Sequence, residues 1–167
     1  MTDPATPAVP TGRRGQRLTY LVKRLEMAER ARLEERLRPL GVTLGQYTAL
    51  SVLERRGGLS SAQLARRHFV TPQAMQQLVA GMERDQLIER RADSANRRIL
   101  RVWLTEHGER MLAACHEAAG QVEQRMLANL EPDEATAFAV TLERCLDALT
   151  EPDGYIEPPP ADAGLDA

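Results

Sequence analysis

The step from Thr71 to Pro72 divides the middle of this chain into two helices. Proline disfavours helical geometry at the residue before it but is favoured at the first position of a helix, so Thr71 is expected to cap a new helix. Upstream, Ser60 and Gln63 have the spacing of a capping box that starts an earlier helix. Two short capped helices joined by a tight connection at residues 68–70 are the sequence outline of a helix-turn-helix motif.

The hydrophobic period changes after the second of these helices. Residues 87–91 and 100–104 are short extended runs, and Leu100, Val102 and Leu104 alternate with Arg101 and Trp103. The segment between them, 92–98, is polar and rich in turn formers. We predict a β-hairpin with its tip at this segment.

Amphipathic helices are predicted on both sides of this region, over about residues 16–39 and, interrupted at Pro132, over about 105–150. A shorter helix capped by Thr43 precedes the motif. The apolar stripes of the outer helices exceed what so small a core can cover, so we expect them to pack on a second copy in a homodimer. Their apolar positions are Leu18, Leu21, Leu25, Ala28 and Leu33 in the first helix, Met111, Cys115, Ala118, Val122 and Met126 in the next, and Phe138, Leu142, Cys145 and Leu149 in the last.

These elements predict a mainly α fold, a winged helix-turn-helix with a small β-hairpin wing (about residues 42–105) plus N- and C-terminal dimerisation helices, in one domain over residues 15–150. Residues 1–14 and the acidic, proline-rich residues 151–167 are predicted to be disordered tails. The sequence has neither a run of roughly 18 apolar residues nor the apolar core of a signal peptide. We therefore expect a cytoplasmic protein with no membrane partner.

Charge is distributed unevenly along the chain. The formal net charge is −2, but residues 55–103 contain ten arginines against four acidic residues, and residues 104–167 contain three basic against fourteen acidic residues. Phosphate binding depends on the local potential and on counterions released at the contact. A basic middle segment can therefore bind DNA within an acidic protein.

Several motifs in order resemble the MarR family of bacterial regulators, from the first helix to about Leu149. The specific segments are Gln63-Leu64-Ala65-Arg66-Arg67, Leu87-Ile88-Glu89-Arg90, Asp93-Ser94-Ala95-Asn96-Arg97-Arg98 and Leu104-Thr105-Glu106-His107-Gly108. The resemblance implies a winged-helix homodimer on a pseudo-palindromic operator, usually a repressor whose DNA affinity falls when a small ligand or an oxidant acts. Two positions depart from the family's pattern, since Asn96 stands where an aspartate is common and Gln86 where a glycine usually precedes the wing.

The helix after Thr71 is expected to read DNA bases. Met75, Leu78, Val79 and Met82 follow the i, i+3, i+4, i+7 rule and should face the core. The outward residues would then include glutamines, which can bind the edge of adenine in the major groove, and the free amides after Thr71 can bind phosphate. The predicted DNA-binding residues, with the wing arginines in the neighbouring minor groove, are Arg66, Arg67, Thr71, Gln73, Gln76, Gln77, Arg84, Arg97 and Arg98.

The signal that such a regulator would sense is less constrained. The family resemblance suggests an effector pocket between the dimer helices and the DNA-binding lobe, with Tyr20, Tyr47 and His68 as candidate lining residues. Cys115 and Cys145 fall on apolar stripes, whereas a redox sensor needs an accessible thiolate, so redox sensing stays an alternative. No metal site and no cofactor is expected, because the histidine pairs with neighbouring acids or cysteine would point about 100° apart on a helix.

The sequence disfavours two other function classes. An enzyme would need a nucleophile with its base, a metal cluster or a phosphate-binding glycine loop, and the sequence contains none of these motifs. A winged-helix module that binds protein rather than DNA remains the alternative, although the ten-arginine segment argues against it.

Overall fold

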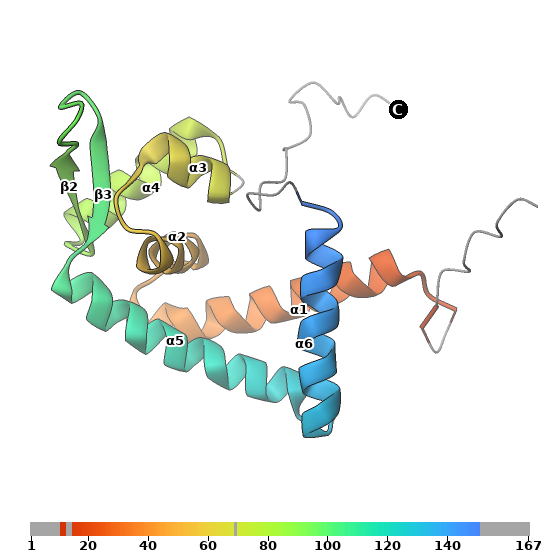
Figure 1. The fold of residues 1–167 in the computed structure, drawn as a ribbon. Helices are drawn as coiled ribbons and strands as arrows, with labels where there is room; N and C mark the ends of the chain where they lie inside the picture. Colours follow the sequence, from red (N-terminus) through yellow and green to blue (C-terminus); the bar gives the residue numbers. More distant parts are fainter. Residues whose placement is uncertain (1–10, 13–14, 69, 151–167) are drawn as a thin grey trace, which may run out of the picture.

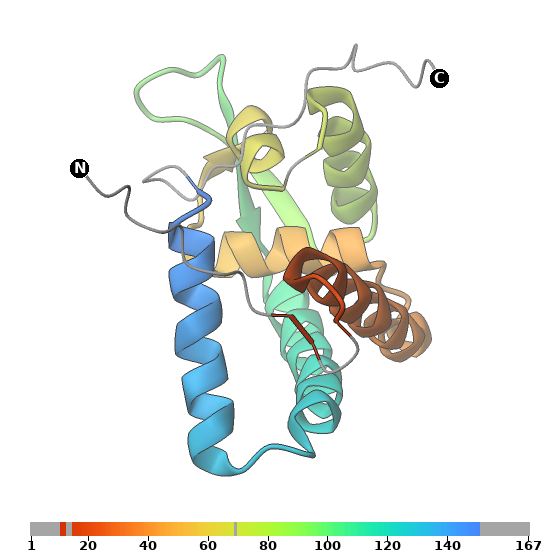
Figure 2. The ribbon, with the colours of Figure 1, turned by 90° about the vertical axis from the view of Figure 1, so that its right-hand side faces the viewer.

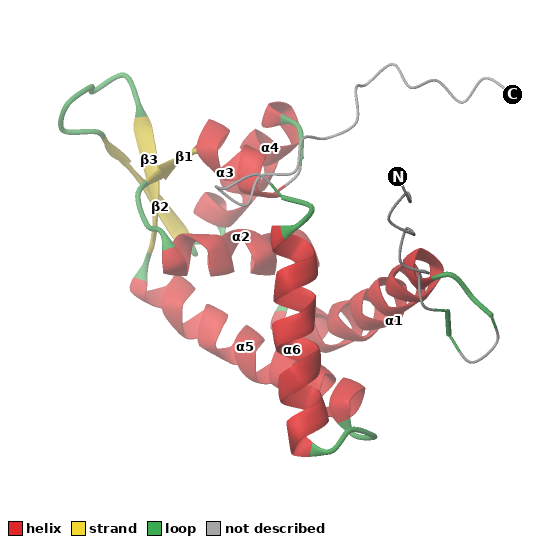
Figure 3. Ribbon diagram, turned by 45° about the vertical axis from the view of Figure 1, so that its right-hand side comes forward, coloured by secondary structure: helices red, strands yellow, loops and turns green. Residues whose placement is uncertain are grey.

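The computed structural model describes residues 11–12, 15–68 and 70–150, and it is built from helices with one small sheet at the edge (Figures 1 and 3). The two predicted tails lie outside the described residues apart from residues 11–12. The predicted mainly α fold is confirmed. In chain order the elements are α1 (Leu18–Leu37), the 3₁₀ turn η1 (Arg38–Leu40), α2 (Leu44–Arg55), β1 (Leu59–Ser60), α3 (Ser61–His68), α4 (Pro72–Arg84), β2 (Ile88–Ala92), β3 (Leu100–Leu104), α5 (Glu106–Leu127) and α6 (Pro132–Asp147).

Side-chain caps define where the helices of the motif begin. The Ser60 hydroxyl accepts a hydrogen bond from the amide of Gln63 at 3.2 Å, and the Gln63 side chain accepts one from the Ser60 amide at 2.9 Å. The Thr71 hydroxyl accepts from the amide of Ala74 at 3.2 Å, with Pro72 at the first helical position. Each such cap stabilises a helix by about 1 kcal/mol. The predicted break at the Thr-Pro step is confirmed.

The sheet is antiparallel with strand order β1-β3-β2. β2 and β3 form the predicted hairpin, in which Ile88 pairs with Leu104 and Ala92 with Leu100. β1, which pairs Leu59 with Val102, was not predicted. A strand of two residues is too short to show a period of two, and its Ser60 also caps α3.

Two hydrophobic clusters make the core. The larger one lies under the helix-turn-helix and the sheet. Of the four α4 residues predicted to face the core, Met75, Val79 and Met82 are fully buried in it, and Leu78 is partly buried against it. The smaller cluster joins Leu33 and Leu37 of α1 to Val42, Cys115 and Ala119. Tyr47 of α2 packs against both clusters.

The start of α5 is locked against the start of the wing. The Thr105 hydroxyl donates to the Gln86 carbonyl at 2.6 Å and accepts from the Gly108 amide at 2.9 Å. A Cβ on Gly108 would lie 1.9 Å from the Leu87 carbonyl oxygen, so only glycine fits. The Leu-Thr-x-x-Gly segment noted in the sequence is this joint.

The outer helices expose much of their apolar surface. α1 is buried only at Leu33 and Leu37, and no residue of α6 is buried. Figure 2 shows α6 rising from the end of α5 as a separate helix. Within the described residues no helix is long and apolar enough to cross a membrane. The exposed apolar side chains of these helices include Leu18, Tyr20, Val22, Leu25, Met27, Val140, Leu142 and Leu146.

Candidate nucleic-acid interface

The face of α4 opposite the core carries the predicted polar residues. Gln73, Gln76 and Gln77 are all exposed, while Met75 and Val79 between them are buried. The pattern is that of an amphipathic helix of 13 residues with one apolar and one polar face, since residues three and four apart share a face. The three glutamines therefore lie on the open side of the first two turns of α4.

The remaining predicted residues of the motif lie around this face. Arg66 is exposed near the end of α3, and Arg67 is half-buried with its guanidinium 3.5 Å from the Gln63 carbonyl oxygen. Thr71 is exposed at the start of α4, and its hydroxyl donates to no other described residue. Arg84, in the last turn, is exposed and lies 3.5 Å from the Asp85 carboxylate.

The wing tip presents Arg97 and Arg98 to solvent. Both side chains are exposed, and among the described residues neither has a carboxylate within ion-pair distance. The other arginines of the hairpin are paired, since Arg90 contacts Glu83, Arg91 contacts Glu89 and Arg101 contacts Asp93. The free positive charge of the hairpin is thus concentrated at its tip.

Asp93 organises the backbone of this tip. One carboxylate oxygen accepts from the amides of Ala95 at 2.8 Å and Asn96 at 3.0 Å, and the other contacts the Arg101 guanidinium. Arg101 and the two backbone amides hold the pKa of the Asp93 carboxyl below its usual range. Sequence reasoning did not single out Asp93 and Arg101 as a pair. The strand register brings the two together. Arg101 pairs with Arg91, and Asp93, two residues after Arg91, points to the same face of the hairpin as Arg91 and Arg101.

The three candidate effector residues are not brought together. Tyr20 is 53% exposed in the first turn of α1. Tyr47 is half-buried where the two core clusters meet, with its hydroxyl 3.1 Å from Nδ1 of His116, and burial raises the pKa of that hydroxyl. The His68 Nε2 lies 2.8 Å from the Gly45 carbonyl oxygen, and its Nδ1 is buried without a partner among the described residues.

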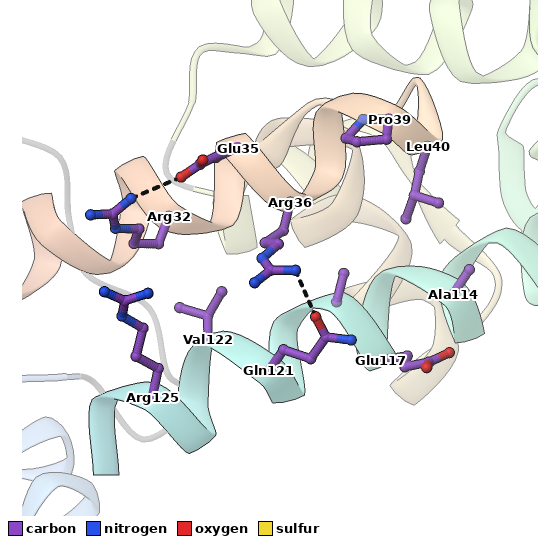
Figure 4. Close-up of a pocket in the computed structure, with 11 residues that line it drawn as sticks. Arg32, Glu35, Arg36, Pro39, Leu40, Ala114, Glu117, Gln121, Val122 and Arg125 are labelled. Atoms are coloured by element: carbon purple, nitrogen blue, oxygen red, sulfur yellow. Dashed lines mark hydrogen bonds and ion pairs between the residues drawn. The ribbon is translucent and has the colours of Figure 1, made fainter. Parts of the chain in front are cut away.

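A separate cleft of about 480 Å³ runs between α1 and α5 (Figure 4). Its walls bring together Arg32, Arg36 and Arg125 beside Gln121, whose amide oxygen accepts from Arg36 at 2.9 Å. Arg32 is paired with Glu35 on the same helix at 3.0 Å. Tyr20, Tyr47 and His68 do not line this cleft.

The cysteines differ in accessibility. Cys115 is buried in the smaller core cluster, and burial raises the pKa of its thiol. Cys145 is exposed on α6. A raised pKa leaves less thiolate at neutral pH, so the environment of Cys115 disfavours reaction with an oxidant.

The chain matches a family model and curated relatives. Residues 40–99 match the model described as MarR family. Over 127 residues the chain is 33% identical to the HTH-type transcriptional repressor Rv2887 of Mycobacterium tuberculosis (strain ATCC 25618 / H37Rv), covering 76% of this chain and 91% of that repressor. This chain belongs to the MarR family. The family expected from the wing and helix motifs is confirmed.

Solved MarR structures share the fold. The M. tuberculosis Rv2887 complex with DNA has a TM-score of 0.69 at 31% identity, covering 77% of this chain and 96% of that chain. The Rv2887 complex with p-aminosalicylic acid has a TM-score of 0.67 at 32% identity, covering 77% and 97%. The apo form of wild type MarR from E. coli, with a TM-score of 0.70 at 24% identity and coverage of 77% and 96%, supports the fold alone.

Both departures from the usual MarR pattern have structural effects. Gln86 has φ of 59°, a left-handed conformation that favours the glycine usual in MarR proteins at this position. Asn96 uses its side-chain oxygen to accept from the Arg98 amide at 3.1 Å, so here it shapes the backbone of the tip. The ion pair next to the wing tip of this MarR protein is made by Asp93 and Arg101.

Proposed function

We propose that this MarR protein is a homodimeric, sequence-specific regulator of transcription, a repressor that leaves a pseudo-palindromic operator when a small-molecule effector binds. One observation carries the proposal. α4 and the tip of the β2–β3 hairpin lie at the end of the molecule away from α1 and α5 (Figure 1), and they carry the exposed glutamines and the exposed Arg97 and Arg98. A helix in the major groove with a basic wing in the adjacent minor groove uses these two features together. The protein would act as a regulator rather than as an enzyme, in the cytoplasm with the DNA.

The proposed contacts divide by type. Gln73, Gln76 and Gln77 would read base edges, because a glutamine amide can pair with adenine through two hydrogen bonds. Phosphate contacts, which position the protein without reading sequence, are assigned to the other residues of the motif. These are Arg66, Arg67, Thr71 and Arg84, with Arg97 and Arg98 in or beside the minor groove.

A second copy of the chain would cover the exposed apolar side chains of the outer helices. Such side chains on α1 and α6 would stay in water in a monomer, at a cost of roughly 25 cal/mol per Å² of apolar surface. Two equal copies related by a two-fold axis would also place two α4 helices on the two halves of a pseudo-palindrome. Sedimentation equilibrium should give twice the chain mass of 18.6 kDa.

Binding to DNA is tested by fluorescence anisotropy with labelled DNA from upstream of the protein's own gene, at several salt concentrations. We expect saturation at one dimer per site, preference over an unrelated duplex and steep weakening with salt, since phosphate contacts release counterions. Equal, salt-independent binding to both duplexes would instead favour the protein-binding alternative.

Arg97→Ala should weaken binding by about 1–3 kcal/mol and lower the salt slope by about one charge. Arg110→Ala is the matched control, because Arg110 is an exposed arginine in the first turns of α5, at the other end of the hairpin from its tip. Equal effects of the two substitutions would remove the wing tip from the interface.

The effector proposal rests on relatives and on one candidate residue. The M. tuberculosis Rv2887 structures include complexes with p-aminosalicylic acid and with salicylic acid, so an aromatic carboxylate is the first class to test. Of the three candidates, Tyr47 is placed between the core of the DNA-binding lobe and that of α1 and α5. A ligand beside it would contact both lobes.

Salicylic acid should release the protein from DNA, and Tyr47→Phe should reduce that release while leaving DNA affinity unchanged. Tyr20→Phe tests a second candidate separately, because Tyr20 lies 13 residues before Leu33 on α1, about 20 Å away by the helical rise. A loss of release with Tyr20→Phe and none with Tyr47→Phe would contradict a site at Tyr47. The same comparison with His68→Ala tests the third candidate.

A further inference from the structure

The wing tip is held by a chain of contacts that ends outside the wing. The Asp93 carboxylate binds the amides of Ala95 and Asn96 and contacts the Arg101 guanidinium. Arg101 in turn donates from Nη1 to the Gly58 carbonyl oxygen at 2.8 Å. The tip is therefore connected through two side chains to the turn between α2 and β1.

Gly58 is a fixed point for this chain of contacts. Its φ is +73°, its amide donates to the Val102 carbonyl at 3.0 Å, and a Cβ there would lie 2.5 Å from the Trp103 ring. A larger residue at Gly58 would be strained and would meet the Trp103 ring, and the backbone hydrogen bond joins the turn to β3. A hydrogen bond to this carbonyl thus anchors Arg101 to a rigid part of the lobe.

The Asp93 side chain is well placed to act as the bridge. It is only 10% exposed, against 37% for Arg101, although both belong to a surface hairpin. Shielding from water strengthens a charge-assisted hydrogen bond. One Asp93 oxygen accepts from two amides of the tip and the other contacts Arg101, which also donates to the Gly58 carbonyl oxygen.

We propose that Asp93 and Arg101 are positioning residues that hold the wing tip in the orientation in which Arg97 meets DNA. This inference rests on the proposed function, since it assigns two residues to the interface without placing either on DNA. The physical gain is preorganisation, because a tip already ordered before binding loses less conformational freedom on binding. Here the contact between Asp93 and Arg101 supplies that order, while the Asn96 side chain accepts a hydrogen bond from the Arg98 amide.

Asp93→Asn separates positioning from simple electrostatics. Removing a negative charge beside DNA should by Coulomb's law tighten binding, whereas loss of the clamp should weaken it. We expect binding about tenfold weaker with an unchanged salt slope, within the range for losing one groove contact. Glu89→Gln is the matched control, because it removes the same charge from the same hairpin without touching the clamp, and it should bind as well as the native chain or better.

Arg101→Met removes the other half of the clamp, and Arg101→Lys tests its geometry. One ammonium cannot reproduce the fork of the guanidinium, so the lysine variant should recover only part of the affinity. If Arg101 instead touched phosphate itself, Arg101→Met would lower the salt slope by about one charge and Asp93→Asn would not weaken binding. That result would overturn the proposal.

A double-mutant cycle shows whether the clamp acts through the tip. Asp93→Asn should cost little further affinity in an Arg97→Ala background, and additive losses would contradict the positioning role. Trypsin gives a readout without DNA, since Asp93→Asn should speed cleavage after Arg97 and Arg98, with thermal unfolding confirming that the variant is folded. If the native chain binds no DNA, the proposed function fails. If it binds and Asp93→Asn matches it in affinity and cleavage rate, only this inference fails.

Discussion

Replacing Gln86 by glycine should stabilise this protein, although most substitutions destabilise proteins. Gln86 connects α4 to β2 with φ of 59°, the left-handed region. For a residue with a Cβ this conformation is less stable by about 1–2 kcal/mol than the right-handed one. Glycine occupies it freely but loses about 0.5–1 kcal/mol more entropy on folding. The net gain is about 0.5–1 kcal/mol per protomer.

Little else at this position should change. The Gln86 side chain is exposed and makes no hydrogen bond with any described residue. Its backbone amide bonds to the Glu83 carbonyl at 3.0 Å and its carbonyl accepts from Thr105 at 2.6 Å, and glycine keeps both bonds. The stabilisation therefore comes from backbone conformation alone.

Urea unfolding followed by circular dichroism measures this effect at one fixed protein concentration, because the stability of a dimer depends on concentration. The midpoint should rise with an unchanged m-value. The melting temperature should rise by about 1–4 °C. Gln86→Ala is the control, since it removes the same polar group but keeps the Cβ and the left-handed penalty. A glycine variant no more stable than the alanine variant would refute the reasoning.

Three further predictions follow from the local geometry. Gly108→Ala should destabilise the protein by about 3 kcal/mol, the upper end for overpacking, because its Cβ would meet the Leu87 carbonyl oxygen at 1.9 Å, and urea unfolding measures this. Thr71→Ala should cost about 1 kcal/mol by loss of the α4 cap, whereas Thr71→Ser should cost little. In the Cys145→Ser variant a maleimide should label the remaining Cys115 only slowly until urea unfolds the protein, because Cys115 is buried and burial raises the pKa of its thiol. Fast labelling of the folded variant would show that the Cys115 region opens readily.

Local signals in the sequence were sufficient for most of the fold. The caps at Ser60 and Thr71 act within three residues of themselves, so their spacing alone located α3 and α4. The apolar period of α4 likewise predicted which of its faces is buried. β1 was missed because its evidence lies in its partner, Val102, more than forty residues away.

The site was predictable only in part. The exposure of the glutamines and wing arginines follows from helix period and hairpin position, and it is seen in the structure, while their contact with DNA stays a prediction. The contact between Asp93 and Arg101 depends on the register of β2 and β3, which cannot be determined from the sequence. The effector residues Tyr20, Tyr47 and His68 stay a prediction, because a pocket depends on how α1, α2 and α5 pack and on what the second copy adds.

The contact of Gly108 with Leu87 has a mechanical consequence, because the joint between α5 and the wing has no room for a hinge. A rotation of α5 must carry the hairpin with it as a lever. With five residues in each strand, the lever is about 16 Å long at about 3.3 Å per residue. A rotation of about 15°, the size of known subunit rotations, would sweep the tip by about 4 Å. That exceeds the roughly 3.4 Å between successive phosphates along the axis of one DNA strand, enough to shift Arg97 out of register while every element stays folded.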